Sequence, residues 1–506
     1  MIDSTPTARA RPWLRGAIAA LAIIVAVLVL QRLGRADVCS DGEAVAGMFM
    51  QQMVEHGQTW FPLANGSIPM STTPPLFHLT ALAIDRALGS THVTATNLRL
   101  PSAIYAIATA TLTMLFAASA LGLEAGVLAG LTLAGSYQFI RLARVGSADM
   151  TLTFFEALAL FSFWWWMRAR ERHAPIPGDA GRGFLYLFAI ALGLAVLAKG
   201  PVGALIAIAA IIIFMIAEGR ARLILAMFDP GVIIVGLAIA SSWYLACYFS
   251  GRSALLAHQL EVANVGRFVG AMGSMPPWFY VTPILLNSVP FSLLVPIAVV
   301  SALRSGRRQP AGEVKPDGPD HERAGQCVRL CAIFWMVTVL LFSFAAYKRK
   351  EYLLPLWPAS AVMLAWWLLT IPPHHSMRVA ATAFTATGAV LIVFNFVHIP
   401  HIESASCEAD SYRPVGEEVA RVVEPDAPIY LFGFTDEPAP LVFYLDRGAH
   451  LLEGRLGDAP PGYVLVPESI WQQNQGTALD LEPVLTSEHG SHRLVLLRHG
   501  KSYASR

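Results

Sequence analysis

Three carboxylates stand at the ends of long apolar segments. Asp41 and Glu43 lie in the sequence CSDGEA, just after the first apolar segment, and Asp149 lies in GSADMTLTFF, at the start of a later one. The order of the apolar segments places all three at the same surface of a membrane. Carboxylates in such a place can take a proton from a hydroxyl group or stabilise positive charge that develops during a reaction. The sequence therefore predicts a catalytic site that faces the compartment outside the cytoplasm.

Basic side chains are predicted at the same surface. One lies in LAKGPVG, at a turn between two apolar segments, and a basic triplet lies in AAYKRKEYLLPLWP, on the side where positive charge is normally depleted. The full set is Arg141, Arg144, Lys199, Arg267, Lys348, Arg349 and Lys350. Any one of them can extend to lipid headgroups. Because so many converge with carboxylates, we favour a binding site for an anion, and phosphate is the obvious candidate.

The elements that position these residues are membrane helices. Of the 506 residues, 55% are hydrophobic and 14% are charged, which is too apolar for a soluble chain, and the net charge of +1 gives no reason to expect nucleic-acid binding. A helix needs about 20 apolar residues to cross a hydrocarbon core of roughly 30 Å. Eleven segments are predicted to cross, the eighth with bends at its prolines: 16–33, 103–121, 125–140, 150–167, 184–198, 202–217, 232–249, 279–303, 330–347, 353–369 and 379–397.

Arginines indicate the orientation of these segments. With the amino terminus in the cytoplasm, alternate loops place arginine-rich sequences such as Arg168, Arg170 and Arg172 inside, as the positive-inside rule requires. Loops 34–101 and 250–278 then lie outside, together with the carboxyl terminus. We predict a membrane module over residues 1–400 and a soluble α/β domain over residues 401–506. In this tail, PIYLFGF, LVFYLD, GYVLVP and HRLVLL are predicted strands, and residues 417–423 a helix.

The five cysteines say little about redox state. Cys39 and Cys407 are both predicted outside, where a disulfide can form, but the sequence gives no distance between them and we favour free or buried thiols. Cys327 and Cys331 are one helical turn apart, with no further ligand nearby that would complete a metal site. We interpret them as packing residues, and no metal or cofactor is expected.

Several short motifs, in a fixed order, resemble the GT-C superfamily of membrane glycosyltransferases that use polyprenyl-phosphate sugars. The resemblance is strongest to the lipid A aminoarabinose transferase and protein O-mannosyltransferase group. It covers residues from about 35 to 370 and rests on DGEAVAGMFMQQMVEHGQTWFPLANG, TTPPLFHLTAL, NLRLPSA, ARVGSADMTLTFF, LAKGPVG, VGRFVG with PPWFY, and FSFAAYKRKEYLLPLWP. The resemblance implies an integral protein of a bacterial inner membrane, a polyprenyl-phosphate-linked sugar as donor, and a lipid, glycan or protein as acceptor.

The resemblance also implies roles for individual residues. It assigns catalytic roles to the pair Asp41 and Glu43 and to Asp149, and donor-phosphate binding to Lys199, Arg267 and Lys348. From the basic triplet we expect Arg349 and Lys350 to bind the donor phosphate as well, and the further candidates for lining the cavity are His78, Glu156 and Tyr352. The family's adjacent acidic pair is split here by Gly42, so either Asp41 or Glu43 can be the catalytic residue. The family's lysine before the Pro-Pro pair is Thr73 here, which removes one phosphate contact.

The expected reaction is a single displacement that inverts the anomeric centre. Fixed Arg and Lys side chains stabilise the leaving phosphate, and a carboxylate deprotonates the acceptor hydroxyl or stabilises charge on the sugar ring. Asp41 and Asp149 can alternatively be helix caps. Two other classes of function stay open: a transporter or flippase, supported by Glu156 within a membrane segment, and a scaffold whose tail binds a partner.

Overall fold

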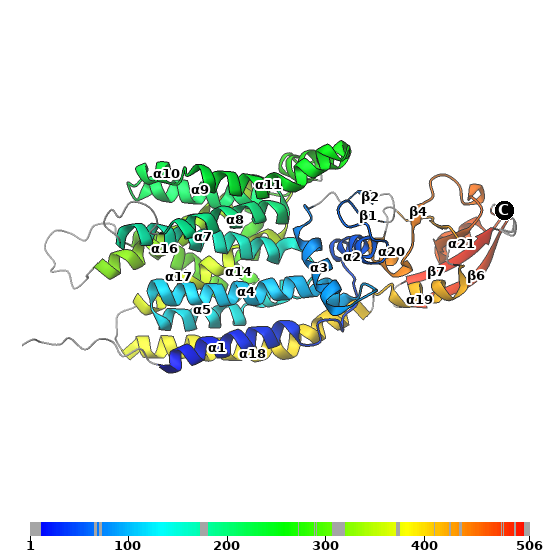
Figure 1. The fold of residues 1–506 in the computed structure, drawn as a ribbon. Coiled ribbons are helices and arrows are strands. Elements are labelled where there is room, and N and C mark those ends of the chain that lie inside the picture. Colours follow the sequence, from blue (N-terminus) through cyan, green and yellow to red (C-terminus); the bar gives the residue numbers. More distant parts are fainter. Residues whose placement is uncertain are drawn as a thin grey trace, which may run out of the picture.

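Long apolar helices lie side by side in a bundle, and a small mixed domain follows at one end (Figure 1). The structure is a computed structural model. It describes residues 12–64, 68–69, 73–172, 181–271, 273–287, 289, 291–305, 319–370, 375–408, 410–424, 427–434, 438–476, 478, 480–489 and 492–499. Residues 306–318 and the arginines before residue 12 lie outside these ranges.

Seven helices among the described residues are long and apolar enough to cross a membrane. They are α1 (Pro12–Leu30), α4 (Ala95–Leu121), α7 (Ala148–Arg172), α8 (Arg182–Lys199), α11 (Pro230–Phe249), α16 (Pro319–Phe344) and α18 (His375–Glu408). Three shorter apolar helices are α5 (Leu123–Gly135), α9 (Val202–Ala217) and α17 (Leu356–Thr370). Each predicted segment overlaps one of these helices or the broken pair described next, while the number that cross the membrane stays a prediction.

The eighth predicted segment is a broken helix. Its first part consists of the 3-10 helix η2 (Pro277–Tyr280) and α14 (Val281–Leu286), and its second part is α15 (Phe291–Arg304). The two parts meet at a bend of 115°. Prolines were the reason to expect a bend, because proline removes a helical hydrogen bond. Pro290 lies outside the described residues, and Pro296 lies within α15.

Two short helices lie between the bundle and the tail (Figure 1): α2 (Asp41–Val54) and α3 (Leu76–Leu88). Between them, β1 (Leu63–Ala64) pairs with β2 (Ile68–Pro69) in an antiparallel ribbon. Helix α4 begins at Ala95, within the predicted outer loop 34–101. Thr94 caps that helix by accepting a hydrogen bond from the amide of Asn97 (3.3 Å), which lets the helix start before the apolar run does.

The second predicted outer loop, residues 250–278, contains short helices. They are α12 (Ser253–Ala257), the π-helix η1 (His258–Gly266) and α13 (Arg267–Val269), while α6 (Tyr137–Leu142), α10 (Arg222–Ala226) and the 3-10 helix η3 (Lys350–Leu353) connect longer helices elsewhere. Of these short elements, α6, α13 and η3 carry side chains that line the cavity described in the next section.

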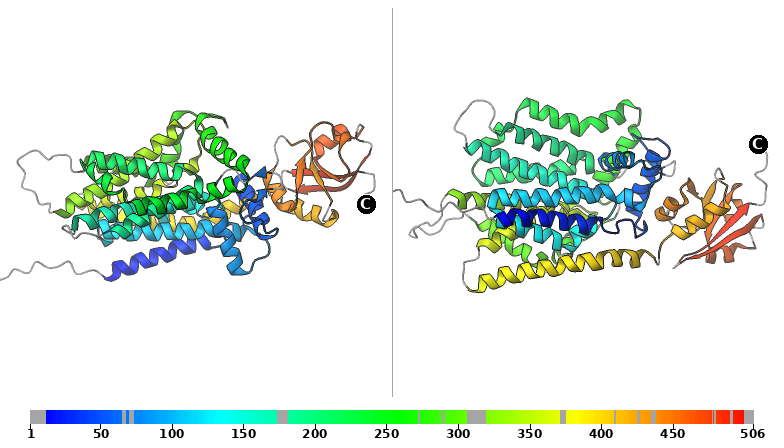
Figure 2. Two further views of the ribbon diagram at one scale, coloured as in Figure 1. Left: turned by 45° about the horizontal axis from the view of Figure 1, so that its top comes forward. Right: turned by 60° about the horizontal axis from the view of Figure 1, so that its bottom comes forward.

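The tail contains one five-stranded sheet of order β4-β3-β5-β7-β6. Its strands are β3 (Ile429–Leu431), β4 (Ala449–Leu451), β5 (Tyr463–Pro467), β6 (Leu481–His489) and β7 (His492–His499); β3 is parallel to β4 and β5, and β7 is antiparallel to β5 and β6. The helical elements are α19 (Arg413–Val422), α20 (Ala439–Leu445), the 3-10 helix η4 (Leu456–Asp458) and α21 (Glu468–Asn474). The predicted boundary at residue 400 falls inside α18, which Figure 2 shows running along one side of the bundle to the tail.

One strand prediction in the tail is wrong. The run LVFYLD forms helix α20 and not a strand. A short apolar run has no periodicity that separates a strand from a buried helix, and this helix is buried because it packs against α2. Gln51 donates a hydrogen bond to the carbonyl of Phe443 (3.0 Å), and Gly47 leaves space for the Phe443 ring.

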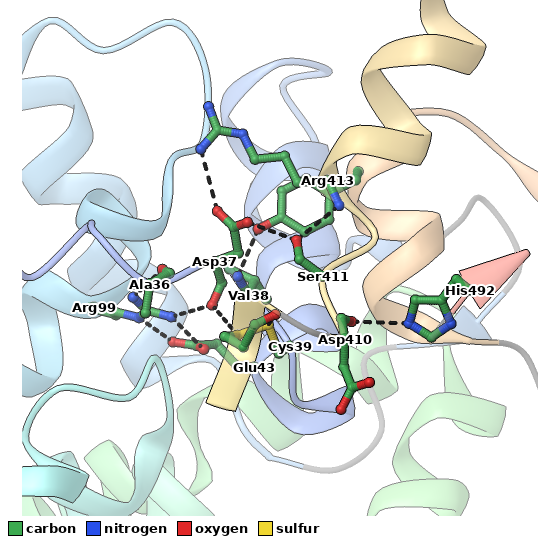
Figure 3. Close-up of a disulfide and its surroundings, with 12 residues drawn as sticks. Ala36, Asp37, Val38, Cys39, Glu43, Arg99, Asp410, Ser411, Arg413 and His492 are labelled. Carbon is green, nitrogen blue, oxygen red and sulfur yellow. Dashed lines mark hydrogen bonds and ion pairs between the residues drawn. A yellow bond between two sulfur atoms is a disulfide. The ribbon is translucent and has the colours of Figure 1, made fainter. Parts of the chain in front are cut away.

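Cys39 and Cys407 form a disulfide, so the interpretation of these residues as unpaired thiols is wrong (Figure 3). They are 368 residues apart in sequence, and only the fold brings α18 to the chain that leads into α2. Next to the disulfide, Asp37 accepts a hydrogen bond from Ser411 (2.7 Å) and pairs with Arg413 (3.3 Å). Cys327 and Cys331 are both buried in α16.

We expect removal of this disulfide to lower the stability of the protein. Because the bond restricts the unfolded chain, Cys39→Ser is expected to cost about 2–5 kcal/mol in the free energy of unfolding. Thermal unfolding of the purified protein with and without reductant measures the effect. The Cys327→Ser variant is the control, since that thiol is free. An unchanged unfolding temperature for Cys39→Ser, or the absence of a Cys39–Cys407 cross-linked peptide in a non-reducing digest, would contradict the assignment.

Candidate active site

A cavity of about 360 Å³ lies where the bundle meets α2 and α3, and it collects most of the predicted site residues. Its walls come from α2, α3, α6, α7, the end of α8, α13 and η3. The predicted residues that line it are Asp41, Glu43, His78, Asp149, Lys199, Arg267, Arg349 and Tyr352, and Thr73 lies in the wall as well. Segments far apart in the sequence thus supply acids and bases to one chamber.

Asp41 is exposed to the cavity. It is the first residue of α2, and the N-cap of that helix is Ser40, so Asp41 does not have the capping role that we considered as an alternative. Within the described part of the chain, no hydrogen bond or ion pair involves its carboxylate. Asp41 is therefore available to a substrate.

Glu43, two residues later, is buried and its carboxylate is hydrogen-bonded within the protein. Its side chain is 5% exposed, and the guanidinium of Arg99 donates to both carboxylate oxygens, at 2.7 and 3.0 Å (Figure 3). The backbone amide of Gly146 donates to the same carboxylate at 2.8 Å. Arg99 also donates to the carbonyls of Ala36 (2.7 Å) and Asp37 (3.0 Å). Glu43 thus joins α2 to α4 and to the turn before α7, which is a structural arrangement.

Asp149 lies in the first turn of α7 and forms an ion pair with Lys199, the last residue of α8. Lys199 also stands 4.8 Å from the centre of the Tyr352 ring, a cation–π contact. The turn after Lys199 requires glycine at position 200, where φ is +92° and a Cβ would lie 2.9 Å from the side-chain Nε2 of Gln259. The predicted turn between two apolar segments is confirmed, and it fixes the ammonium in the cavity.

Arg267 and Arg349 line the cavity from two neighbouring segments of the chain. Arg267 has no ion-pair partner in the described ranges, and its Nε is buried without an acceptor. Arg349 is 45% exposed and makes one long ion pair, 3.4 Å, with Glu351. A guanidinium can bind two phosphate oxygens at once. Arg267 and Arg349 therefore bring two guanidinium groups to the cavity that the carboxylates line.

His78 is a buried, neutral member of the cavity wall. Its ring is 3% exposed, lies against Phe49 and Phe77, and has both nitrogens without a partner in the described structure. Burial lowers the pKa of His78 to about 4. The imidazole is therefore uncharged at neutral pH, and it can donate one hydrogen bond and accept one.

Three predicted residues do not line the cavity. Lys348 is 2% exposed and donates to backbone carbonyls, and Lys350 is exposed elsewhere on its loop. Glu156 is fully buried in α7, with no hydrogen-bond partner among the described residues, so it does not form the lower wall of this cavity. A single buried carboxyl outside the cavity gives little support to the transporter alternative.

The sequence analysis predicted no specific role for several other residues. Arg141 and Glu351 line the cavity, although the family resemblance assigned them no role. Arg99, the partner of Glu43, stands in the motif NLRLPSA, and a charge at the start of an apolar helix is a signal that a partner exists. Arg144 is structural: it pairs with Glu403 (3.0 Å) and donates to the carbonyls of α1.

Comparisons with known proteins agree with this architecture. Residues 19–250 match the family model of the dolichyl-phosphate-mannose-protein mannosyltransferases. An uncharacterized protein of Aquifex aeolicus is 26% identical over 84% of this chain and 87% of its own length. The undecaprenyl phosphate-alpha-4-amino-4-deoxy-L-arabinose arabinosyl transferase of Pectobacterium carotovorum is 26% identical over 40% of this chain, a match that spans 34% of that enzyme.

Two solved structures share the fold. The structure of ArnT from Cupriavidus metallidurans bound to undecaprenyl phosphate has a TM-score of 0.75 at 16% identity and covers 98% of this chain and 100% of its own. The archaeal oligosaccharyltransferase AglB from Archaeoglobus fulgidus has a TM-score of 0.56 at 13% identity, over 91% of this chain and 70% of its own. At these identities the likeness concerns the fold.

Proposed function

We propose that the chain is a GT-C membrane glycosyltransferase that uses a polyprenyl-phosphate sugar and transfers this sugar to a hydroxyl group on the extracytoplasmic side of the membrane, with inversion. One observation carries this proposal most directly. Asp41 has no hydrogen-bond or ion-pair partner among the described residues, and it shares a cavity with Arg267 and Arg349; in the same part of the chain Arg267 makes no ion pair and Arg349 makes one long one.

The cavity residues suggest a division of roles in the reaction. Asp41 takes the proton of the acceptor hydroxyl as its oxygen attacks the anomeric carbon. The bond from that carbon to the phosphate oxygen breaks, and both electrons leave with the polyprenyl phosphate. Arg267 and Arg349 stabilise the charge on the leaving phosphate, and they need no rearrangement because the fold already holds them there. Asp149 holds Lys199 at the same chamber through their ion pair.

The donor is proposed from the relatives and from the cavity together. The bacterial relatives include an enzyme named for an undecaprenyl phosphate sugar, and a structural neighbour holds undecaprenyl phosphate. Both fit a cavity with cations for a phosphate. The acceptor is a hydroxyl-bearing lipid, lipid A included, or a glycan or protein.

The sidedness is proposed from chemistry at the two ends of the bundle. The cavity end carries the Cys39–Cys407 disulfide, which is typical of an oxidising compartment such as the bacterial periplasm. At the other end of the bundle, Arg168 and Arg170 lie in the last turns of α7 and Arg220 follows α9, as expected for the cytoplasmic side of an inner membrane.

Mass spectrometry of cell-envelope lipids and glycans tests the function. Cells with the protein are expected to contain one sugar adduct that is absent from cells without it, and the adduct mass identifies sugar and acceptor together. Cells that produce Asp41→Asn at the same level serve as the control and should lack the adduct. If the protein changes only the distribution of an unmodified lipid between leaflets, the transporter alternative is correct.

The phosphate site gives a prediction that does not depend on the identity of the sugar. Because hydrogen bonds to charged groups contribute about 1.5–3 kcal/mol, Arg267→Ala and Arg349→Ala are each expected to weaken undecaprenyl phosphate binding about tenfold or more. Titration of the purified protein in detergent measures the dissociation constant. Lys350→Ala is the matched control, because this cation lies on the same loop but outside the cavity. Equal affinities for all variants would place the phosphate elsewhere.

A further inference from the structure

The two loops that carry Arg267 and Arg349 are joined to each other by backbone hydrogen bonds. The amide of Tyr347 donates to the carbonyl of Arg267 (3.0 Å), and the amide of Ala346 donates to the carbonyl of Phe268 (2.9 Å). The amide of Met275 in turn donates to the carbonyl of Ala346 (2.9 Å). We call residues 267–271 and 273–275, together with residues 345–349, the paired loops.

Lys348 lies inside this arrangement. Its side chain is 2% exposed, and its ammonium donates to the carbonyl of Met275 (2.9 Å) and to that of Ala345. One acceptor belongs to each of the paired loops. Lys348 thus adds a side-chain connection beside the three backbone bonds, immediately before Arg349 in the sequence.

The geometry separates Lys348 from the cations that face the cavity. Arg267 and Arg349 line the cavity, whereas Lys348 does not. A buried ammonium is stable only where acceptors replace its hydration shell, and here the acceptors are the main-chain carbonyls of Met275 and Ala345. The charge is therefore used within the protein and not on the substrate.

We infer that Lys348 is a positioning residue, which holds the paired loops together so that Arg267 and Arg349 present their guanidinium groups to the same phosphate. This inference rests on the proposed phosphate site. It replaces the expectation that Lys348 itself binds the phosphate. It also explains why a basic triplet contains three different environments: Lys348 buried between loops, Arg349 at the cavity and Lys350 exposed to solvent.

Gly270 offers an independent way to disturb the same loops. Its φ is +95°, and a Cβ at this position would lie 3.1 Å from the Cβ of Ala346. Both the conformation and the close approach favour glycine. Gly270→Ala is therefore expected to push the loops apart without any change of charge.

Undecaprenyl phosphate binding and hydrogen exchange test the inference together. Lys348→Met keeps the length of the side chain but removes its donors, and it is expected to weaken binding about tenfold. Peptides that contain the amides of Ala346, Tyr347 and Met275 are expected to exchange faster in this variant. Lys350→Met, the matched control, should change neither measurement. Gly270→Ala should reproduce both effects, and it serves as the test if Lys348→Met fails to fold.

The outcomes separate this inference from the proposed function. If the wild-type protein does not bind undecaprenyl phosphate, the proposed phosphate site is wrong. If the wild type binds and Lys348→Met binds equally well, the positioning role is wrong. Weaker binding without faster exchange in the paired loops would also overturn it, because that combination indicates direct contact between Lys348 and the phosphate.

Discussion

Replacement of Asp41 by asparagine is expected to lower the rate of sugar transfer by about 10²–10⁴-fold, the usual contribution of a general base. Asparagine keeps the size of the side chain but cannot accept the hydroxyl proton. Since Asp41 has no partner in the described part of the chain, its loss leaves no buried group unpaired. The fold and the affinity for undecaprenyl phosphate should therefore persist. Transfer is measured in membranes with a lipid-linked sugar donor, and binding with the purified protein.

Asp149→Asn is the variant with which Asp41→Asn should be compared. Asp149 shares the cavity but pairs with Lys199, so its replacement also changes the position of a cation. We expect Asp149→Asn to impair donor binding as well as transfer, whereas Asp41→Asn should impair transfer alone. Undiminished transfer by Asp41→Asn would exclude the base that we propose.

The sequence predicted which segments meet better than it predicted what each side chain does there. Asp41, Asp149, Lys199, Arg267 and Arg349 do share one cavity, as their common membrane surface required. Their placement follows from apolar segments and their order, which are visible in any single sequence. What they do in catalysis stays a proposal, supported by exposure and pairing.

The choice between Asp41 and Glu43 shows what the sequence lacked. The two carboxylates are two residues apart, and both belong to the first turn of α2. They differ only in their partners, because Arg99 reaches Glu43 from α4, 56 residues away in sequence. Lys348 and Arg349 are likewise adjacent in sequence, but the Lys348 side chain donates to the carbonyl of Met275 whereas the Arg349 side chain lines the cavity. The direction of a side chain after a turn depends on the loop that packs against it, and that loop is remote in sequence.

The errors in the tail have the same origin. LVFYLD forms a helix, and Cys39 forms a disulfide with Cys407, because α2, α18 and the tail lie against one another. Local pattern was sufficient for GYVLVP and HRLVLL, which are the central strands β5 and β7. It was insufficient wherever a segment is buried against an element distant in sequence.

Loss of Arg99 is expected to have the largest effect on stability. Arg99→Met leaves the Glu43 carboxylate buried without its partner, and removing one member of a buried pair costs about 3–5 kcal/mol. It also removes donors from the carbonyls of Leu33, Ala36 and Asp37, in the chain that leads to Asp41. We expect a lower temperature of thermal unfolding and, at temperatures where the protein remains folded, lower transfer because Asp41 is less well positioned.

Arg413→Met is the matched control, because Arg413 also binds Asp37 but its side chain is 55% exposed. An exposed ion pair contributes only about 0–1 kcal/mol. The double variant Glu43→Gln with Arg99→Met should be more stable than Arg99→Met alone, since it removes the unpaired charge. If Arg99→Met unfolds no earlier than Arg413→Met, Glu43 is not held as a structural group, and the reason to prefer Asp41 as the base disappears with it.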